Sequence, residues 1–403
     1  MKKLIAIAVV FILAVGVAFA ADVVVDVIGA ITPLKGNSKD GSTVDAYGMF
    51  NRIRIEASGQ NDDGNFGGWL RFVPNNAWDG SGISGGTTYG EAVKAAGFVW
   101  WKPHDIFKLQ IGVNPDGHFN VDGVAPRWGF YQVASDARVA VENWYFGESF
   151  YAGYGTPGAI LTLTPLEPLE INVAIPFLTT GWGTKASEVY KQFHGQVAYN
   201  LGSIGKVALT YASNTNELDG SDYDGTPGSI TSSPSKLFGY FGITAIENLD
   251  IDLGVGYTLP VKDEVMINSK KQPISVNAPV AVGLGVNFTA GALGIKARVQ
   301  GEFGGSVTIA GKAEKDDTVF TADLMPTFEV TDSVKAYLST GLRMTSYAKD
   351  GMDSKVQWHI QPYVSVKANW WAPNFYAGIR FEGTGDANKT TEWSVPIGIV
   401  FSF

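Results

Sequence analysis

The sequence contains no cysteine, four histidines and six methionines in 403 residues. The lack of cysteine excludes disulfide scaffolds, thiol nucleophiles and cysteine zinc sites. The histidines are far apart and show no metal-ligand spacing, so we expect no metal and no cofactor; they are His104, His118, His194 and His359. There is no Gly-x-Ser-x-Gly elbow either. We therefore expect no enzymatic activity.

Long apolar runs are also scarce, and the one clear case lies at the N-terminus. Two lysines precede an apolar stretch, and Ala18-Phe19-Ala20 then offers the small-x-small pattern of a signal peptidase site. We expect a signal peptide at 1–20 and a mature domain at 21–403; the alternative is an N-terminal membrane anchor. No later segment approaches the roughly 20 apolar residues of a membrane helix. If the mature chain spans a membrane, it must do so with strands.

Positive charge is in short supply. Removing residues 1–20, which hold two lysines and no acid, changes the formal net charge from −9 to −11. An acidic exported chain lacks the basic surface that phosphate binding needs, so nucleic acid is not an expected partner.

Glycine and aromatic residues are abundant, with 49 glycines, 23 phenylalanines, 16 tyrosines and 11 tryptophans. This composition favours strands and turns. The recurrent pattern has period two in runs of about ten residues. In 295–303, for example, Ile295, Ala297, Val299 and Phe303 share one face, and Lys296, Arg298, Gln300 and Glu302 share the other.

The connections between these runs alternate between tight turns and long polar loops, as in an outer-membrane barrel. Aromatic residues cluster at both ends of the runs, where rings favour the membrane interface. We expect an all-β fold, a transmembrane antiparallel barrel of about 18 strands (16–18) with short periplasmic turns and long extracellular loops. The expected strands are 22–31, 46–57, 66–73, 92–102, 106–113, 157–164, 169–177, 190–201, 206–213, 236–245, 250–258, 279–289, 294–303, 318–328, 334–344, 356–367, 373–383 and 393–403. A soluble exported β-sandwich, which also alternates apolar and polar residues, is the alternative.

In the C-terminal run, every second residue is apolar up to a terminal phenylalanine: Val395, Ile397, Ile399, Phe401 and Phe403. It resembles the last strand of bacterial outer-membrane β-barrels, and the chain as a whole resembles a general-diffusion or sugar-type porin. The resemblance implies an outer-membrane location, contact with outer-membrane lipid, recognition of Phe401 and Phe403 by the barrel-assembly machinery, and a homotrimer. It also implies that the third long loop, 114–156, folds into the lumen.

A barrel of this size leaves an aqueous channel whose polar inner face sets selectivity. The expected pore-lining residues are Arg52, Arg54, Glu56, Arg71, Lys108, Glu170, Lys296, Arg298, Glu302, Arg343, Arg380 and Glu382. Among them Arg52, Arg54 and Arg71 are the best candidates for a basic patch, and we expect a mildly basic bore with a preference for anions. Cross-strand pairing of most of these charges is the simpler interpretation.

Loop 114–156 combines rings with charges, and its constriction candidates are Arg127, Trp128, Arg138, Glu142 and Trp144. The function that we expect is passive diffusion of small hydrophilic solutes and ions through a water-filled barrel. Two alternatives remain open: a substrate-specific, carbohydrate-type channel, or a plugged barrel that serves as a surface adhesin or structural protein.

Overall fold

The computed structural model describes residues 22–38, 47–79, 94–113, 157–176, 193–213, 218–219, 231–232, 235–267, 270–277, 280–309, 311–315, 317–347, 354–367, 374–385 and 391–402. Most of them are in strands, and the one helix among them is a single 3-10 turn at Gly202–Ile204. No helix in this part of the chain is long and apolar enough to cross a bilayer.

The largest sheet of the described chain has 19 strands, each antiparallel to its neighbours. They are β1 (Asp22–Asn37), β2 (Tyr47–Gln60), β3 (Phe66–Asp79), β4 (Lys94–His104), β5 (Phe107–Val113), β6 (Pro157–Leu166), β7 (Leu169–Pro176), β8 (His194–Asn200), β9 (Gly205–Ala212), β12 (Lys236–Ile246), β13 (Leu249–Thr258), β16 (Val280–Ala290), β17 (Leu293–Phe303), β20 (Thr318–Thr331), β21 (Val334–Ser346), β22 (Lys355–Lys367), β23 (Asn374–Gly378), β24 (Arg380–Thr384) and β25 (Thr391–Ser402).

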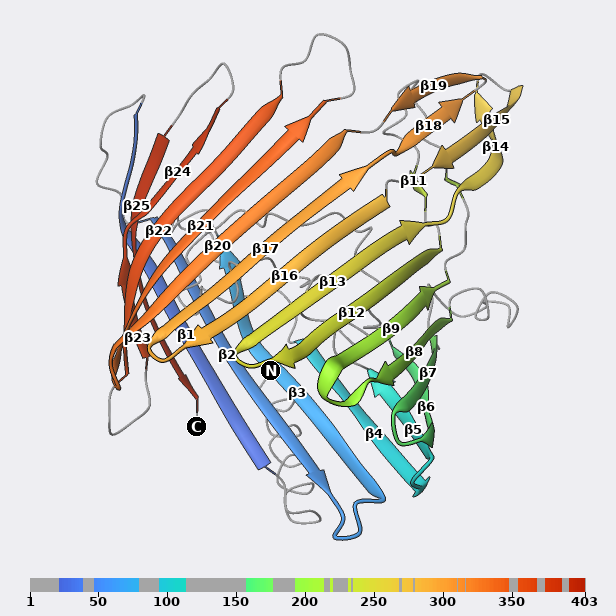
Figure 1. Cartoon of the computed structure of the whole chain (residues 1–403), viewed down its shortest axis with the longest axis horizontal. Coiled ribbons are helices and arrows are strands. Elements are labelled where there is room, and N and C mark those ends of the chain that lie inside the picture. The colour runs from blue at the N-terminus through green and yellow to red at the C-terminus, as the bar shows by residue number, and fades with distance from the viewer. Residues whose placement is uncertain are drawn as a thin grey trace.

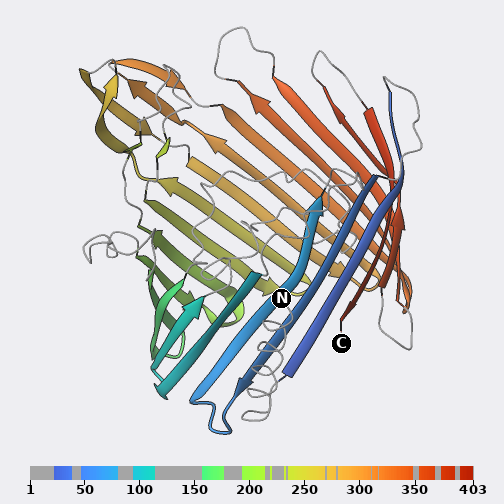
Figure 2. The same ribbon diagram turned by 180° about the vertical axis from the view of Figure 1, so that it is seen from behind.

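The sheet closes on itself, because β1 pairs with β2 on one side and with β25 on the other. Figures 1 and 2 show the tilted strands of the two walls from opposite sides. Strands β23 and β24 both pair with β22 and β25 and are separated only by Ile379, so the 19 described strands occupy 18 positions around the ring. The expected antiparallel β-barrel is confirmed.

Strands β1 and β3 each extend six residues beyond the end that the sequence pattern indicates, and each continues through a proline. We expected strands to end at residues 31 and 73, but β1 runs to Asn37 and β3 to Asp79. Opposite β25, the register of β1 gains one residue between Ile31 and Leu34, around Pro33. Opposite β2, the register of β3 gains one residue between Phe72 and Asn75, around Pro74. A bulge leaves one residue outside the ladder and so accommodates a residue without an N–H.

Three segments expected as loops contain strands, which corrects the prediction. Segment 214–235 holds β10 (Leu218–Asp219) and β11 (Thr231–Ser232), while 259–278 holds β14 (Val261–Ile267) and β15 (Lys270–Asn277). Segment 304–317 holds β18 (Ser306–Ile309) and β19 (Lys312–Lys315). Strands β14, β15, β18 and β19 form a separate sheet beyond one rim of the barrel (Figure 1).

Strand β15 pairs with β18 and so joins connection 259–278 to connection 304–317. Ile274 faces Ile309 and Val276 faces Val307 in the register. Ile274 and Ile309 are buried. The apolar side chains of each segment are therefore buried only when the two connections pair with each other.

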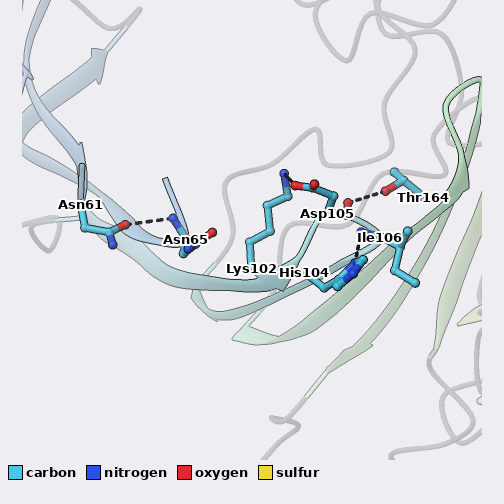
Figure 3. Close-up of polar contacts among 7 residues, drawn as sticks. All are labelled: Asn61, Asn65, Lys102, His104, Asp105, Ile106 and Thr164. Atoms are coloured by element: carbon cyan, nitrogen blue, oxygen red, sulfur yellow. Dashed lines mark hydrogen bonds and ion pairs between the residues drawn. The ribbon is translucent and has the colours of Figure 1, made fainter. Parts of the chain in front are cut away.

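The short connections at the opposite rim are held by local polar contacts (Figure 3). The Asn61 Oδ1 atom accepts a hydrogen bond from the Asn65 N–H at 2.9 Å. At the turn between β4 and β5, Lys102 Nζ lies 3.0 Å from Asp105 Oδ1 and donates a hydrogen bond to it. This hydrogen bond is the main cause that lowers the pKa of Asp105, and the positive charge of Lys102 is the second. Thr164 Oγ1 donates to the Asp105 carbonyl at 2.8 Å and joins this turn to β6.

The outer face of the ring is apolar, with rings near its two ends. Exposed aliphatic side chains on this face include Val197, Leu209, Leu253, Val282, Val299, Leu324 and Ile360. Exposed rings include Trp101, Tyr199 and Phe328 near the short turns and Tyr257, Phe303 and Phe381 near the other rim. An apolar band between two aromatic girdles is the surface that a bilayer requires.

Arginine substitutions on this face test its contact with lipid. Leu253 is 41% exposed in the middle of β13, and an outward arginine costs about 2–4 kcal/mol at the bilayer midplane but about 0–1 near the interface. We expect Leu253→Arg to lower the free energy of unfolding in lipid vesicles by about 2–4 kcal/mol, measured by urea titration and by the gel shift between folded and heated protein. Val330→Arg, on the same face near the short turns, is the control. Equal tolerance of both substitutions would contradict contact of this face with hydrocarbon.

Candidate channel lining

The inner face of the ring is polar. On β17, Arg298 is 7% exposed and Gln300 2% exposed, whereas Val299 between them is 39% exposed. The same alternation recurs around the ring, where buried polar side chains include Gln110, Asn172, Gln196, Thr210, Asp252, Thr321, Asp323, Ser339, His359, Gln361, Ser365 and Arg380. Two stacked layers would bury the apolar face instead. The polar face here surrounds the space inside the barrel.

Strand register puts the predicted lining residues on this inner face wherever their side chains are described. The set is Arg54, Glu56, Arg71, Lys108, Glu170, Lys296, Arg298, Glu302, Arg343, Arg380 and Glu382. They do not form a single site: one group lies on β2 to β7, and another on β17 to β24.

One row of inner positions crosses five neighbouring strands. The register pairs Arg298 with Asp323, Asp323 with Gly341, Gly341 with His359, and His359 with Glu382. Arg298 and Asp323 are thus direct cross-strand neighbours, so their opposite charges partly offset one another. The wall in this row is consequently less basic than its arginine alone suggests.

The glycine in this row makes room for its neighbours. A Cβ atom at Gly341 would lie 2.6 Å from Asp323 Oδ1 and 2.7 Å from His359 Nδ1. His359 Nε2 is 3.3 Å from Ser339 Oγ, and the imidazole is 1% exposed. The polar side chains on both sides therefore lie over the glycine backbone.

Two early arginines share one carboxylate. Glu56 Oε1 lies 2.6 Å from Arg71 Nε and 3.3 Å from Arg54 Nε. On β24, Arg380 pairs with Glu382 at 2.5 Å. Two of the three arginines of the predicted basic patch, Arg54 and Arg71, thus lie beside a carboxylate.

A group of rings on the inner face of β3 and β4 is absent from the sequence prediction. Trp69 and Phe98 stack with ring centroids 5.4 Å apart, and Arg71 Cζ lies 4.9 Å from the Trp69 ring centroid. Lys108 Nζ lies 4.9 Å from the ring centroid of Trp100. The available signal was the Trp-Trp dipeptide: in a strand of period two, one of the adjacent indoles must face inward.

These rings border a cavity of about 930 Å³ on the inner wall near the short turns. Its other lining side chains are polar and include Lys108, Gln110, Thr162, Glu170, Asn172 and Gln196. Thr162 Oγ1 donates to Asn172 Oδ1 at 2.6 Å, and Asn172 Nδ2 donates to Glu170 Oε1 at 2.7 Å. The cavity thus has an aromatic side and a hydrogen-bonded polar side.

Several predicted sites lie outside the described residues. These are the signal peptide 1–20, loop 114–156 with Arg127, Trp128, Arg138, Glu142 and Trp144, the side chain of Arg52, and Phe403. The backbone of Phe401 pairs with Val27 at the seam between β1 and β25. Within the described ranges no group of three or more histidine, cysteine, aspartate or glutamate residues could hold a metal ion.

The fold and its two faces define a closed antiparallel β-barrel with an apolar exterior and a polar interior. Solved structures with a similar fold include three proteins of Pseudomonas aeruginosa. OpdL has 10% sequence identity and a TM-score of 0.56, and the match covers 95% of this chain and 98% of OpdL. OpdQ has 9% identity, a TM-score of 0.54 and coverage of 95% and 98%, and OpdK with vanillate has 8% identity, a TM-score of 0.53 and coverage of 95% and 99%. At these identities the likeness shows the fold alone. No protein-family model matches the chain, and no curated protein sequence matches it.

The glycine in the charged row provides a stability test. We expect Gly341→Ala to lower the free energy of unfolding by about 1–3 kcal/mol, because its Cβ would displace the Asp323 and His359 side chains in a packed wall. Gly239→Ala is the matched control, since its Cβ would meet nothing closer than 4.0 Å. Urea unfolding in vesicles measures both variants. If the Gly341 variant were as stable as the Gly239 variant, the close packing over Gly341 would be refuted.

Proposed function

We propose that the protein is a porin of the bacterial outer membrane that lets small hydrophilic solutes and ions diffuse passively through its barrel. The observation that carries this proposal is the polar inner face of a closed ring whose outer face is apolar. A polar face inside a closed ring favours a water-filled interior, and the apolar face around it requires lipid. OpdK, similar in fold, is an outer-membrane protein, which supports the same location here.

The width of the ring supports a water-filled bore. Barrels of about eight strands are filled by their own side chains, whereas barrels of 16–18 strands leave an aqueous channel. The described strands occupy 18 positions. We infer that ions and small solutes pass between the charged wall at β17 to β24 and the aromatic wall at β3 and β4.

Further parts of the proposal concern residues that the structure does not describe. We propose that residues 1–20 direct export and are removed, that loop 114–156 narrows the lumen, and that the barrel-assembly machinery recognises the end of the chain at Phe401 and Phe403. A homotrimer is part of the same proposal, by resemblance to porins. None of these steps requires a cofactor or catalytic chemistry.

Single-channel recording in planar bilayers tests the proposal. Purified folded protein should give discrete conductance steps that scale with salt concentration, as a water-filled bore requires. A folded barrel that inserts without conductance steps would contradict the porin and favour the plugged adhesin or structural barrel. Partition of the protein into detergent-free buffer as a folded species would favour the soluble β-protein.

Glu56 provides a test of selectivity. Glu56→Gln removes the carboxylate that Arg54 and Arg71 share, so the bore gains positive potential. We expect the anion-to-cation permeability ratio from reversal potentials to rise by about twofold in dilute salt, and the change to shrink near 1 M, where the Debye length is about 3 Å. Glu167→Gln, in the exposed turn between β6 and β7, makes the same change of net charge as a control. The same shift in both variants, or a shift toward cations, would contradict a lining role for Glu56.

A further inference from the structure

We propose that a glycine-lined groove on the outer wall of β2 to β5 holds one acyl chain of a zwitterionic phospholipid whose headgroup carries an ammonium group. The inference goes beyond the porin function, because it assigns a ligand to the outer face and requires no passage of solute. It rests only on the contact of that face with lipid.

The strand register places the groove on the outer face of the barrel. Gly59 of β2 is the direct partner of Gly68 of β3. Across the next ladder, Gly68 pairs with Val99 and Leu70 pairs with Gly97. Direct partners in a ladder point to the same face, and Val99 is 51% exposed on the outside of the ring. The three glycines therefore lie together on the side that faces lipid.

The missing side chains make this part of the outer wall concave. The groove has a volume of about 460 Å³, and its apolar side walls are formed by Phe66, Leu70, Val99, Ile111 and Val113. This is about three times the ~150 Å³ of an engineered apolar cavity that binds benzene. Its floor is strand backbone, because a Cβ atom at Gly68 would lie 3.2 Å from the Phe98 carbonyl oxygen and one at Gly97 3.1 Å from that of Trp69.

The surroundings of the groove select hydrocarbon as its occupant. The groove is continuous with the apolar band of the outer face, where Ile111 and Val113 are 44% and 37% exposed. Within a bilayer an apolar hollow is filled by whatever packs against it, and van der Waals contact then supplies the affinity. A single flexible acyl chain fits a narrow groove with a smooth backbone floor.

The end of the groove lies at the short turns. Phe66 pairs with Trp101 on the last rung of β3 and β4, and Trp101 belongs to the aromatic girdle that marks the membrane interface. The headgroup of a lipid whose chain lies in the groove is therefore placed beside turns 61–65 and 102–106, in the periplasmic leaflet of the expected orientation.

The charges of these two turns favour an ammonium group. The turns contain three carboxylates, those of Asp62, Asp63 and Asp105, and one lysine, Lys102. Lys102 Nζ is already 3.0 Å from Asp105 Oδ1. Anionic headgroups bind where lysines and arginines gather, so an anionic phospholipid is disfavoured here. A headgroup that carries an ammonium beside its phosphate is attracted by the carboxylates.

A glycine elsewhere on the outer face provides a matched control. Gly239 of β12 pairs with Val255 on one side and Leu209 on the other, and these side chains are 51% and 56% exposed. A Cβ atom at Gly239 would meet nothing closer than 4.0 Å. An added side chain there projects into lipid without filling the groove of β2 to β5.

Native mass spectrometry of the purified, delipidated barrel tests the proposal by titration with phosphatidylethanolamine and with phosphatidylglycerol of the same acyl chains. We expect phosphatidylethanolamine to bind the unaltered protein more tightly than phosphatidylglycerol. Gly68→Ile should weaken phosphatidylethanolamine binding by about tenfold because the side chain fills the groove, Gly68→Ala should weaken it less, and Gly239→Ile should leave it unchanged. Asp62→Asn combined with Asp63→Asn should remove the preference between the two lipids.

The gel shift on heating confirms that each variant is folded, and the outcomes then separate the possible occupants. Equal affinity of Gly68→Ile and Gly239→Ile for phosphatidylethanolamine would overturn the groove as a lipid site. Tighter binding of phosphatidylglycerol to the unaltered protein would overturn the choice of headgroup. An oligomer that Gly68→Ile abolishes while lipid binding is unchanged would show that a second copy of the chain occupies the groove. Each of these results would leave the porin proposal intact, because conductance is measured separately.

Discussion

The structure depends on one constraint: in hydrocarbon, every backbone N–H and C=O must find a partner within the protein. A sheet meets this condition only when it has no edge, and here the pairing of β1 with β25 removes the edge. The constraint also explains how proline is tolerated. Pro33 and Pro74 lie at bulges, and the Pro362 carbonyl still accepts a hydrogen bond from the Ile379 N–H at 3.0 Å, where β23 gives way to β24.

Closure of the sheet gives the barrel an outer and an inner face, and charged side chains are then restricted to the inner face. Once apolar residues occupy the outside, the alternate residues of each strand must point inward, whatever their charge. Inward charged side chains form ion pairs with their neighbours, as Glu56 does with two arginines and Arg380 does with Glu382. Selectivity in such a bore depends on the small imbalance that pairing leaves, and not on the number of charged residues.

Sequence alone predicted what depends on period two. The inward position of Arg298 and the outward position of Val299 follow from alternation, and so does the barrel itself. Features that depend on pairing between distant segments were missed. The predicted strand ends near Pro33 and Pro74 were wrong. A proline in the local sequence favours the end of a strand, whereas the bulge that accommodates it depends on the partner strand. The contact of Ile274 with Ile309 joins two connections that each looked like a polar loop.

The open bore depends on glycine as much as on polarity. A large inner side chain either projects across the lumen or lies along the wall, and it can lie along the wall only where the neighbouring strand has no Cβ. The Trp100 indole lies over Gly67 and the His359 imidazole over Gly341. In both pairs the glycine is the direct register partner of the large residue. These pairings let the wall carry an indole and an imidazole close to its backbone.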